Sequence, residues 1–222
     1  MKCKLIIIIT VLFSTYGYSQ NEINNCCDFE TGICDFFAQN KFLILKNGAL
    51  KMGDKGSYLQ INDTLILDTV FTIAFAFKPE DIDQTQSLIY MANTQTKQKV
   101  LLKIEDNKGN VALETEYHYY RLGKMKTNSW THIAFTYDGK VFKAYWNGQE
   151  KTVIADINLT GVNSLFLGNI PQDTKRFKGF IDDFCYYNRL LTKDDISGLN
   201  EKQQQKQTVL EKQVVKIPDV NT

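Results

Sequence analysis

The most regular pattern of hydrophobic and polar residues lies between positions 129 and 148. Two runs, 130–137 and 141–146, place alternate side chains on opposite faces, which is the period of a β-strand. Asp138-Gly139 and Asn147-Gly148 follow these runs, and both sequences tolerate the positive φ angles of the type I′ turn that joins paired strands. The stretch therefore predicts a β-meander whose registers are fixed at both ends.

Shorter strand-like runs occur on both sides of the meander. Turn sequences such as 106–109 and 122–123 separate these runs, which lie at 42–45, 58–61, 70–78, 87–91, 99–104, 111–120 and 165–168. In the run 70–78 the large side chains share one face, which we expect in the core, and the smaller ones share a face expected to meet solvent or a ligand. No helical period of useful length precedes residue 192. Many short strands with regular turns predict an all-β, antiparallel sandwich.

The two ends of the chain differ from this domain. Lys2 and Lys4 precede an apolar run at 5–13, and Gly17 and Ser19 then precede a cleavage site, which predicts a secretory signal peptide at 1–19. Nine apolar residues are too few to span a membrane, since a spanning helix needs about 20. The sandwich would then occupy 20–199, and 200–222, rich in Gln and Lys, would form a polar tail that is helical or disordered.

Charge and cysteine content narrow the class of protein. Without Lys2 and Lys4, 24 basic residues remain against 25 acidic ones, so the balance gives no electrostatic case for nucleic acid or an anionic membrane as partner. After the predicted cleavage an even number of cysteines remains, which is typical of an oxidising compartment: Cys26, Cys27, Cys34 and Cys185. Cys26 and Cys27 are adjacent and point to opposite faces of a strand, so we expect them to take different partners.

Two motifs resemble those of laminin-G-like domains in the concanavalin A-like lectin/glucanase superfamily. Residues 130–148 fit W-x-H-[IV]-A-x-x-Y-[DN]-G…Y-x-[ND]-G, and residues 177–191 fit F-x-G-x-I-D-[DE]-[VF]-x-x-[YW]-[ND]-R-x-L. The resemblance implies a jelly-roll sandwich followed by a short C-terminal helix, for which Thr192 is the expected N-cap. It also implies a secreted, non-catalytic module that binds a glycan or a glycoprotein surface. A glycoside hydrolase and a purely structural adhesion or assembly module are the alternatives.

A second, shorter resemblance concerns the disulfides. Cys27-Asp-Phe-Glu30 followed by Cys34 resembles the opening of MAM domains, another jelly-roll family, in which the two cysteines are paired. This resemblance implies a Cys27–Cys34 bridge, which leaves Cys26 for Cys185. The reverse assignment of Cys26 and Cys27 is the alternative.

Asp182 is the most unusual charged residue in the second motif. Strand alternation places its carboxylate on the same face as Phe180, Phe184 and Tyr186, and an unpaired buried charge is costly. We expect hydrogen bonds to satisfy it. The alternative is a calcium ion, with Asp183 and Asp63 as further ligands, although alternation puts Asp183 on the opposite face. No other cofactor is indicated.

The run 111–120 carries the candidate chemistry. Its alternation puts Glu114, Glu116, His118 and Tyr120 on one face and Tyr117 and Tyr119 on the other. Glucanases of the superfamily carry E-x-D-x-[x]-E on one strand face, and the central Asp and final Glu are missing here, so no catalytic residue is predicted. The glutamates and His118 would instead be solvated or contact a sugar ligand.

Aromatic side chains are the other candidates for ligand contact. Tyr117, Tyr119, Tyr120 and Trp146 could stack on sugar rings, with core packing as the alternative. Besides His118, the only histidine is His132, which excludes a His-rich metal site. We expect His132 to be a hydrogen-bonded residue of the sheet.

Overall fold

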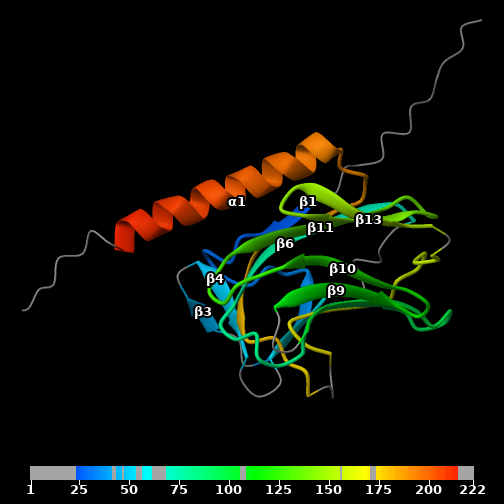
Figure 1. Ribbon diagram of the computed structural model, residues 1–222, viewed down its shortest axis with the longest axis horizontal. Coiled ribbons are helices and arrows are strands. Elements are labelled where there is room, and N and C mark those ends of the chain that lie inside the picture. The colour runs from blue at the N-terminus through cyan, green and yellow to red at the C-terminus, as the bar shows by residue number, and fades with distance from the viewer. Residues whose placement is uncertain are drawn as a thin grey trace, which may run out of the picture.

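Two antiparallel β-sheets pack face to face in the computed structural model, and one helix lies over the outer face of one of them (Figure 1). The structure describes residues 24–41, 44–46, 48–53, 57–61, 69–105, 109–155, 157–170 and 174–214. The all-β antiparallel sandwich predicted from the strand periods is therefore confirmed. Within the ranges just given, no helix is both long and apolar enough to cross a membrane.

The two sheets are called sheet A and sheet B. Sheet A has eight strands, in the order β13 (Gln149–Ile154), β12 (Phe142–Trp146), β11 (Thr131–Tyr137), β6 (Phe71–Pro79), β15 (Gly179–Tyr187), β4 (Ala49–Met52) and β3 (Ile44–Lys46), with β1 (Asn24–Cys27) paired to β15. Sheet B has seven strands, in the order β10 (Tyr119–Lys124), β9 (Asn110–Thr115), β8 (Gln98–Ile104), β7 (Gln86–Asn93), β14 (Ser164–Leu167), β5 (Tyr58–Ile61) and β2 (Phe37–Lys41).

The core lies between the sheets and is rich in aromatic side chains. Along β6 the large residues predicted to face the core do so, and Phe71, Phe75 and Phe77 are fully buried. On β12, Trp146 also faces inward and packs edge-on against Phe77, with ring centroids 6.2 Å apart. Alternation of large apolar side chains thus fixes which face of each central strand meets the other sheet.

The central meander forms as β11, β12 and β13, with one turn that differs from the prediction. Asn147 and Gly148 both have positive φ, at 48° and 77°, as a type I′ turn requires. At the other turn only Gly139 is in the left-handed region. The Asp138 carboxylate accepts bonds from the backbone N–H groups of Lys140 and Val141, at 2.9 and 2.7 Å. That side-chain bonding stabilises a longer loop at 138–141 in place of a two-residue turn.

Two features of sheet B also differ from the sequence prediction. The run 111–120 is not one strand, because β9 ends at Thr115 and β10 begins at Tyr119. The Thr115 hydroxyl accepts bonds from the backbone N–H groups in the intervening turn, which close the hairpin. Gly123, expected in a turn, instead lies in β10 beside a bulge, where a Cβ would come within 2.5 Å of the Trp146 ring.

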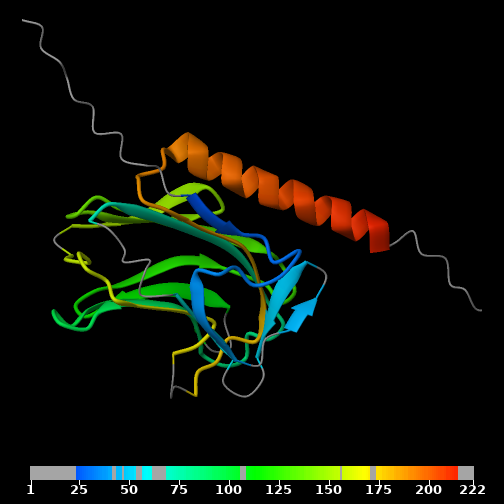
Figure 2. The same cartoon turned by 180° about the vertical axis from the view of Figure 1, so that it is seen from behind.

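The helix α1 (Lys193–Val214) covers the outer face of sheet A (Figures 1 and 2). Its start is the predicted one, because the Thr192 hydroxyl accepts a bond from the backbone N–H of Asp195 while the Asp195 carboxylate accepts from Thr192. Ile196 anchors the first turns against Ala74 and Ala134 of the sheet. The small face of β6, expected to meet solvent or ligand, is therefore buried under α1.

Both expected disulfides are present. Cys26 is bonded to Cys185, which ties β1 to β15 across 159 residues of sequence, and Cys27 is bonded to Cys34 across seven. These pairs are the ones expected, and the reverse assignment of Cys26 and Cys27 is wrong. The predicted signal peptide at 1–19 and the last residues of the predicted tail, 215–222, lie outside the described residues.

Candidate functional site

The outer face of sheet B, called the open face here, carries a straight row of side chains across six strands. The inward neighbours on the same strands, such as Leu59, Leu102 and Leu167, are fully buried in the core. The alternate residues therefore point outward, and they pair strand to strand in the register Gln60, Phe166, Tyr90, Leu101, Glu114, Tyr119. We call these six residues the open row. Adjacent strands lie about 4.8 Å apart, so the row is about 24 Å long.

Aromatic rings gather at one end of the open row. Phe166 lies 5.7 Å from Tyr58 and 6.4 Å from Tyr90 between ring centroids, and all three side chains are half-buried. Tyr119 stands at the other end and is 46% exposed. Partly exposed rings on a sheet offer apolar surface on which a sugar ring can stack.

Paired charges occupy the part of the face next to Tyr119. The Glu114 carboxylate is bonded to the Lys103 ammonium, which also lies 5.6 Å from the centre of the Tyr119 ring. The Lys103 bond outweighs the effect of burial and lowers the pKa of Glu114, with further help from the nearby charge of Lys99. Glu105 is bonded to the Tyr119 hydroxyl and to Arg121, and its pKa is also lowered. Both carboxylates are therefore held ionised and partnered.

The residues predicted for ligand binding divide into three groups. Glu114 and Tyr119 are brought together on the open face. Glu116, Tyr117 and His118 lie in the exposed turn between β9 and β10. The prediction placed Glu116 and His118 on one face of a strand and Tyr117 on the other, and it is wrong because the strand stops at Thr115. Tyr117 is 74% exposed there.

Tyr120 and Trp146 form the third group and point into the core. Tyr120 is paired with the inward-facing Leu113 and packs against the main core cluster. Trp146 is almost fully buried between Phe77 and Gly123. The core-packing alternative therefore holds for Trp146, whereas Tyr120 is half-buried, with its ring between the core and the exposed His118 at a centroid distance of 5.9 Å.

Sequence reasoning missed most of the aromatic end of the open row. Tyr58, Tyr90 and Phe166 each alternate with buried aliphatic residues, so their strands do carry a signal that the ring faces away from the core. The signal becomes a site only when β5, β14 and β7 are placed side by side. That adjacency follows from topology, since β14 lies more than 70 residues after β7.

The outer face of sheet A, called the covered face, holds the predicted inward aspartate. Asp182 is 1% exposed, but it lies beneath α1 and not in the core beside Phe184. The pairing of β15 with β6 shifts register between Asp182 and Cys185, and Asp183 has a φ of 49°. This β-bulge breaks the alternation on which the prediction relied, so Asp182 faces out while Phe184 faces in.

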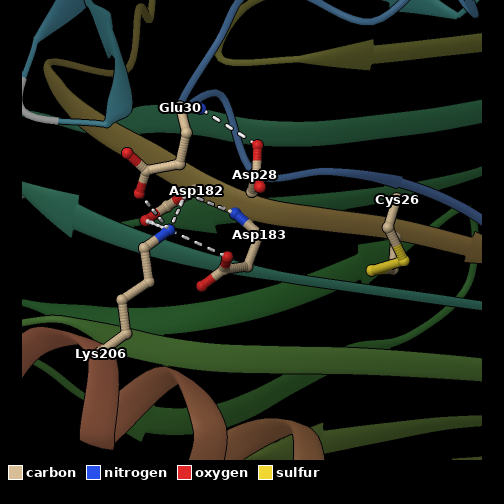
Figure 3. A network of polar contacts seen from close by, with 7 residues as sticks. Cys26, Asp28, Glu30, Asp182, Asp183 and Lys206 are labelled. Atoms are coloured by element: carbon tan, nitrogen blue, oxygen red, sulfur yellow. Dashed lines mark hydrogen bonds and ion pairs between the residues drawn. A yellow bond between two sulfur atoms is a disulfide. The ribbon is translucent and has the colours of Figure 1, made fainter.

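The bulge brings three acidic side chains to one lysine of α1 (Figure 3). The Lys206 ammonium lies 2.9 Å from Asp182, 3.2 Å from Asp183 and 3.2 Å from Glu30, measured to carboxylate oxygens. The expectation that Asp183 points to the opposite face is therefore wrong. The Asp182 carboxylate also accepts a 2.8 Å bond from the Asp183 backbone N–H, so it is satisfied by hydrogen bonds and an ion pair.

Burial dominates the electrostatics of this cluster. Burial, assisted by the charge of Asp183, raises the pKa of Asp182 to about 7 despite the opposing effect of Lys206. Burial likewise raises the pKa of Asp183. Burial favours the neutral amine of Lys206, but its bonds to the two aspartates outweigh this and raise its pKa. The Lys206 ammonium thus supplies a positive charge beside Asp182, the residue for which a calcium ion was the alternative partner.

In the described ranges, no group of three or more His, Cys, Asp or Glu side chains is placed to hold a metal ion. Calcium binding stays a prediction. Asp63, the third residue suggested for calcium, lies outside the described residues.

His132 lies on the covered face beside a cavity of about 190 Å³ under α1. Its backbone exchanges bonds with Asn147, at 3.0 and 2.8 Å, but its ring Nδ1 has no hydrogen-bond partner within the described part of the chain. The expected side-chain hydrogen bond is therefore not made by this atom. Burial lowers the pKa of His132 to about 4, so the ring is neutral at pH 7.

Solved structures share this fold at low sequence identity. Domain 4 of AbnA, a GH43 extracellular arabinanase from Geobacillus stearothermophilus, in complex with arabinotriose, is 23% identical with a TM-score of 0.59, covering 80% of this chain and 87% of its own. Trypanosoma rangeli sialidase in complex with the inhibitor DANA is 15% identical with a TM-score of 0.62, covering 72% of this chain and 28% of the sialidase. The Botulinum neurotoxin serotype D binding domain is 16% identical with a TM-score of 0.55, covering 81% and 46%.

Sequence comparison places the chain in a family. No curated protein matches it. The family model described as the concanavalin A-like lectin/glucanases superfamily matches residues 53–197, which is more than half of the chain and includes both motifs up to the start of α1. Together with the fold, this match shows that the chain belongs to the concanavalin A-like lectin/glucanase superfamily.

Proposed function

We propose that the protein is exported and binds carbohydrate, as a free glycan or on a glycoprotein, through the open face without cleaving it. The observation that carries this proposal is the open row, which combines partly exposed rings, two of them adjacent, with the hydrogen-bonding side chains of Gln60 and Glu114 on one sheet face. Two disulfides fit an oxidising compartment outside the cytoplasm. A domain of the same fold occurs in complex with arabinotriose, which makes glycans the first ligand class to test.

The state of Glu114 supports binding over hydrolysis. A glycosidase needs a general acid whose pKa is raised and a second carboxylate across the scissile bond. Glu114 has the opposite shift, since its bond to Lys103 lowers its pKa. Glu116, the nearest carboxylate in sequence, lies in the exposed turn and not on the strand.

A glycan array tests the proposal directly. Wild-type protein should bind a subset of glycans, and the Tyr90→Ala, Phe166→Ala double variant should lose that binding while keeping its fold by circular dichroism. Tyr117→Ala is the matched control, because this tyrosine is in the turn outside the open row and its removal should leave binding unchanged. Failure of wild-type protein to bind any glycan would refute the proposal. Equal binding by the double variant would place the site elsewhere.

A further inference from the structure

The cavity between α1 and sheet A, called the helix cavity here, is bordered by two buried polar atoms that have no hydrogen-bond partner among the described residues. We propose that the helix cavity binds a small uncharged molecule that has a compact apolar body and a hydroxyl group, such as a phenol. The site lies on the covered face, on the other side of the sandwich from the open row. It therefore does not depend on glycan binding.

The helix cavity lies between two points at which α1 is fixed to sheet A. Near the start of the helix, Ile196 packs against Ala74 and Ala134. Ten residues later, about 15 Å along the helix axis, Lys206 is bonded to Asp182. The space between these anchors is largely apolar, and its lining includes Ala74, Leu199 and the Cys26–Cys185 disulfide.

The two polar atoms enter the helix cavity from opposite sides. His132 is 2% exposed and lies on the outer face of β11, since its neighbour Ile133 faces the core. Gln203 is 4% exposed and comes from α1. Both residues line the cavity, and neither His132 Nδ1 nor Gln203 Nε2 has a hydrogen-bond partner in the described part of the chain. Buried polar atoms are normally partnered, so the pair marks a place where a ligand can supply the bonds.

The volume of the helix cavity favours a molecule larger than one water. A water molecule takes about 30 Å³ in the liquid, whereas an apolar cavity of about 150 Å³ is large enough to bind benzene. The helix cavity measures about 190 Å³. It therefore has room for a six-membered ring with one substituent.

A hydroxyl group matches the chemistry of both unpartnered atoms. Gln203 Nε2 is an amide nitrogen and can only donate, while Nδ1 of a neutral histidine donates or accepts according to its tautomer. Burial keeps His132 neutral at pH 7 by lowering its pKa to about 4. A hydroxyl oxygen accepts from Gln203, and its hydrogen is available to His132. The apolar remainder of the ligand would contact Ala74 and Leu199.

The distribution of charge in the lining favours an uncharged ligand. The buried polar groups, His132 and Gln203, carry no charge, so an ion beside them would be buried without a counter-charge, which is costly. Asp28 and Lys202 also line the cavity, but both are exposed and mark its opening to solvent. A small molecule can therefore enter without displacement of α1.

A titration followed by two-dimensional NMR tests the site with two probes of similar size, phenol and toluene. Phenol should shift the amide signals of Ala74, His132 and Gln203 and leave those of the open row unchanged. Toluene should shift the same signals, because it shares the apolar ring. The titration also gives a Kd for each probe.

Two variants separate the hydroxyl from the ring. Gln203→Met keeps the length of the side chain without its nitrogen, and His132→Phe keeps a ring without Nδ1. Each should raise the Kd for phenol about fivefold, the loss of one hydrogen bond, and leave the Kd for toluene within about twofold. Gln205→Met, at an exposed position of α1, is the matched control and should change neither value. All three variants should keep the wild-type melting temperature.

Three results would overturn this inference: binding of neither probe, signal shifts only outside the helix cavity, or an equal response of phenol and toluene to both variants. Tighter binding of benzoate or benzylammonium than of phenol would also overturn it, because the lining would then hold an ion. Each of these outcomes leaves glycan binding at the open face intact, and the glycan array tests that proposal separately.

Discussion

The covered face and the open face are built from the same kind of strands, yet they differ in what completes them. On the covered face, α1 buries small side chains such as Ala74, and Asp182 receives its counter-charge from Lys206 of the helix. On the open face, no described element overlies Phe166 or Tyr90, and the ion pair of Lys103 with Glu114 is partly exposed. The comparison separates a face whose charged groups hold the fold together from a face whose charged groups are available to a ligand.

The largest expected effect comes from the disulfides. In the chain-entropy model, Cys26–Cys185 stabilises the fold by roughly 5 kcal/mol because it closes a long loop, while Cys27–Cys34 contributes roughly 2 kcal/mol. Replacing Cys26 and Cys185 with serine should therefore lower the free energy of unfolding more than replacing Cys27 and Cys34. Urea unfolding of both double variants measures the difference. Equal losses would show that the long bridge adds no more than a local one.

The second largest loss of stability is expected when the Lys206 ammonium under α1 is removed. At pH 8, where Asp182 is ionised, Lys206→Met leaves Asp182 and Asp183 buried without their counter-charge, and breaking such a buried pair costs about 3 to 5 kcal/mol. The measurement is the melting temperature, with Lys202→Met, an exposed lysine one turn earlier on α1, as control. A Lys206→Met variant that melts with wild type would show that α1 does not depend on this cluster.

The raised pKa of Asp182 should make the covered face sensitive to pH. Folded protein keeps this proton up to about pH 7, whereas the unfolded chain releases it near 3.8, so the folded state binds more protons between these values. The contribution of Asp182 to the free energy of unfolding therefore falls as pH rises from about 4 to about 7, by about 4 kcal/mol at most.

The Asp182→Asn variant isolates this contribution from the other carboxylates. The difference in unfolding free energy between wild type and Asp182→Asn should decline from pH 4 to pH 7 and stay constant at slightly higher pH. A difference that grows with pH over this range would mean that Lys206 holds Asp182 ionised and that the pKa of Asp182 is lowered.

The matching substitution on the open face should have the smallest effect. Lys103→Met breaks an ion pair that water reaches, and such pairs contribute about 1 kcal/mol or less. Its melting temperature should stay close to that of wild type, in contrast to Lys206→Met. If Lys103→Met is as destabilising as Lys206→Met, the open face is also a structural face.

These contrasts also show how much of the structure the sequence can predict. Alternation in β6 predicted the core side of the sandwich, and Thr192 predicted where the helix begins, because each depends on residues close together in sequence. The outer side of β6 was predicted to be open and is covered, since the covering residues come from α1, more than 110 residues later.

The site residues show the same limit. The predicted direction of the Asp182 side chain was wrong because of a single β-bulge, which alternation cannot reveal. Trp146 was a candidate for stacking on sugars because its packing partner Gly123 lies on the other sheet, where the sequence does not show the contact. Phe166 and Tyr90 were missed because their contact depends on the strand order of sheet B. The local sequence pattern therefore predicted most of the strands and the start of the helix. Which residues share a face could be known only once the strands were placed in space.

Hydrogen exchange on the glycan-bound protein tests the central claim most directly. With a glycan selected from the array at saturating concentration, backbone amides of β14, β7, β8 and β9 should exchange more slowly than in free protein, and those of α1, β6 and β11 should be unchanged. Protection confined to α1 and the strands beneath it, with none across the open row, would show that the ligand binds the covered face and would contradict the account.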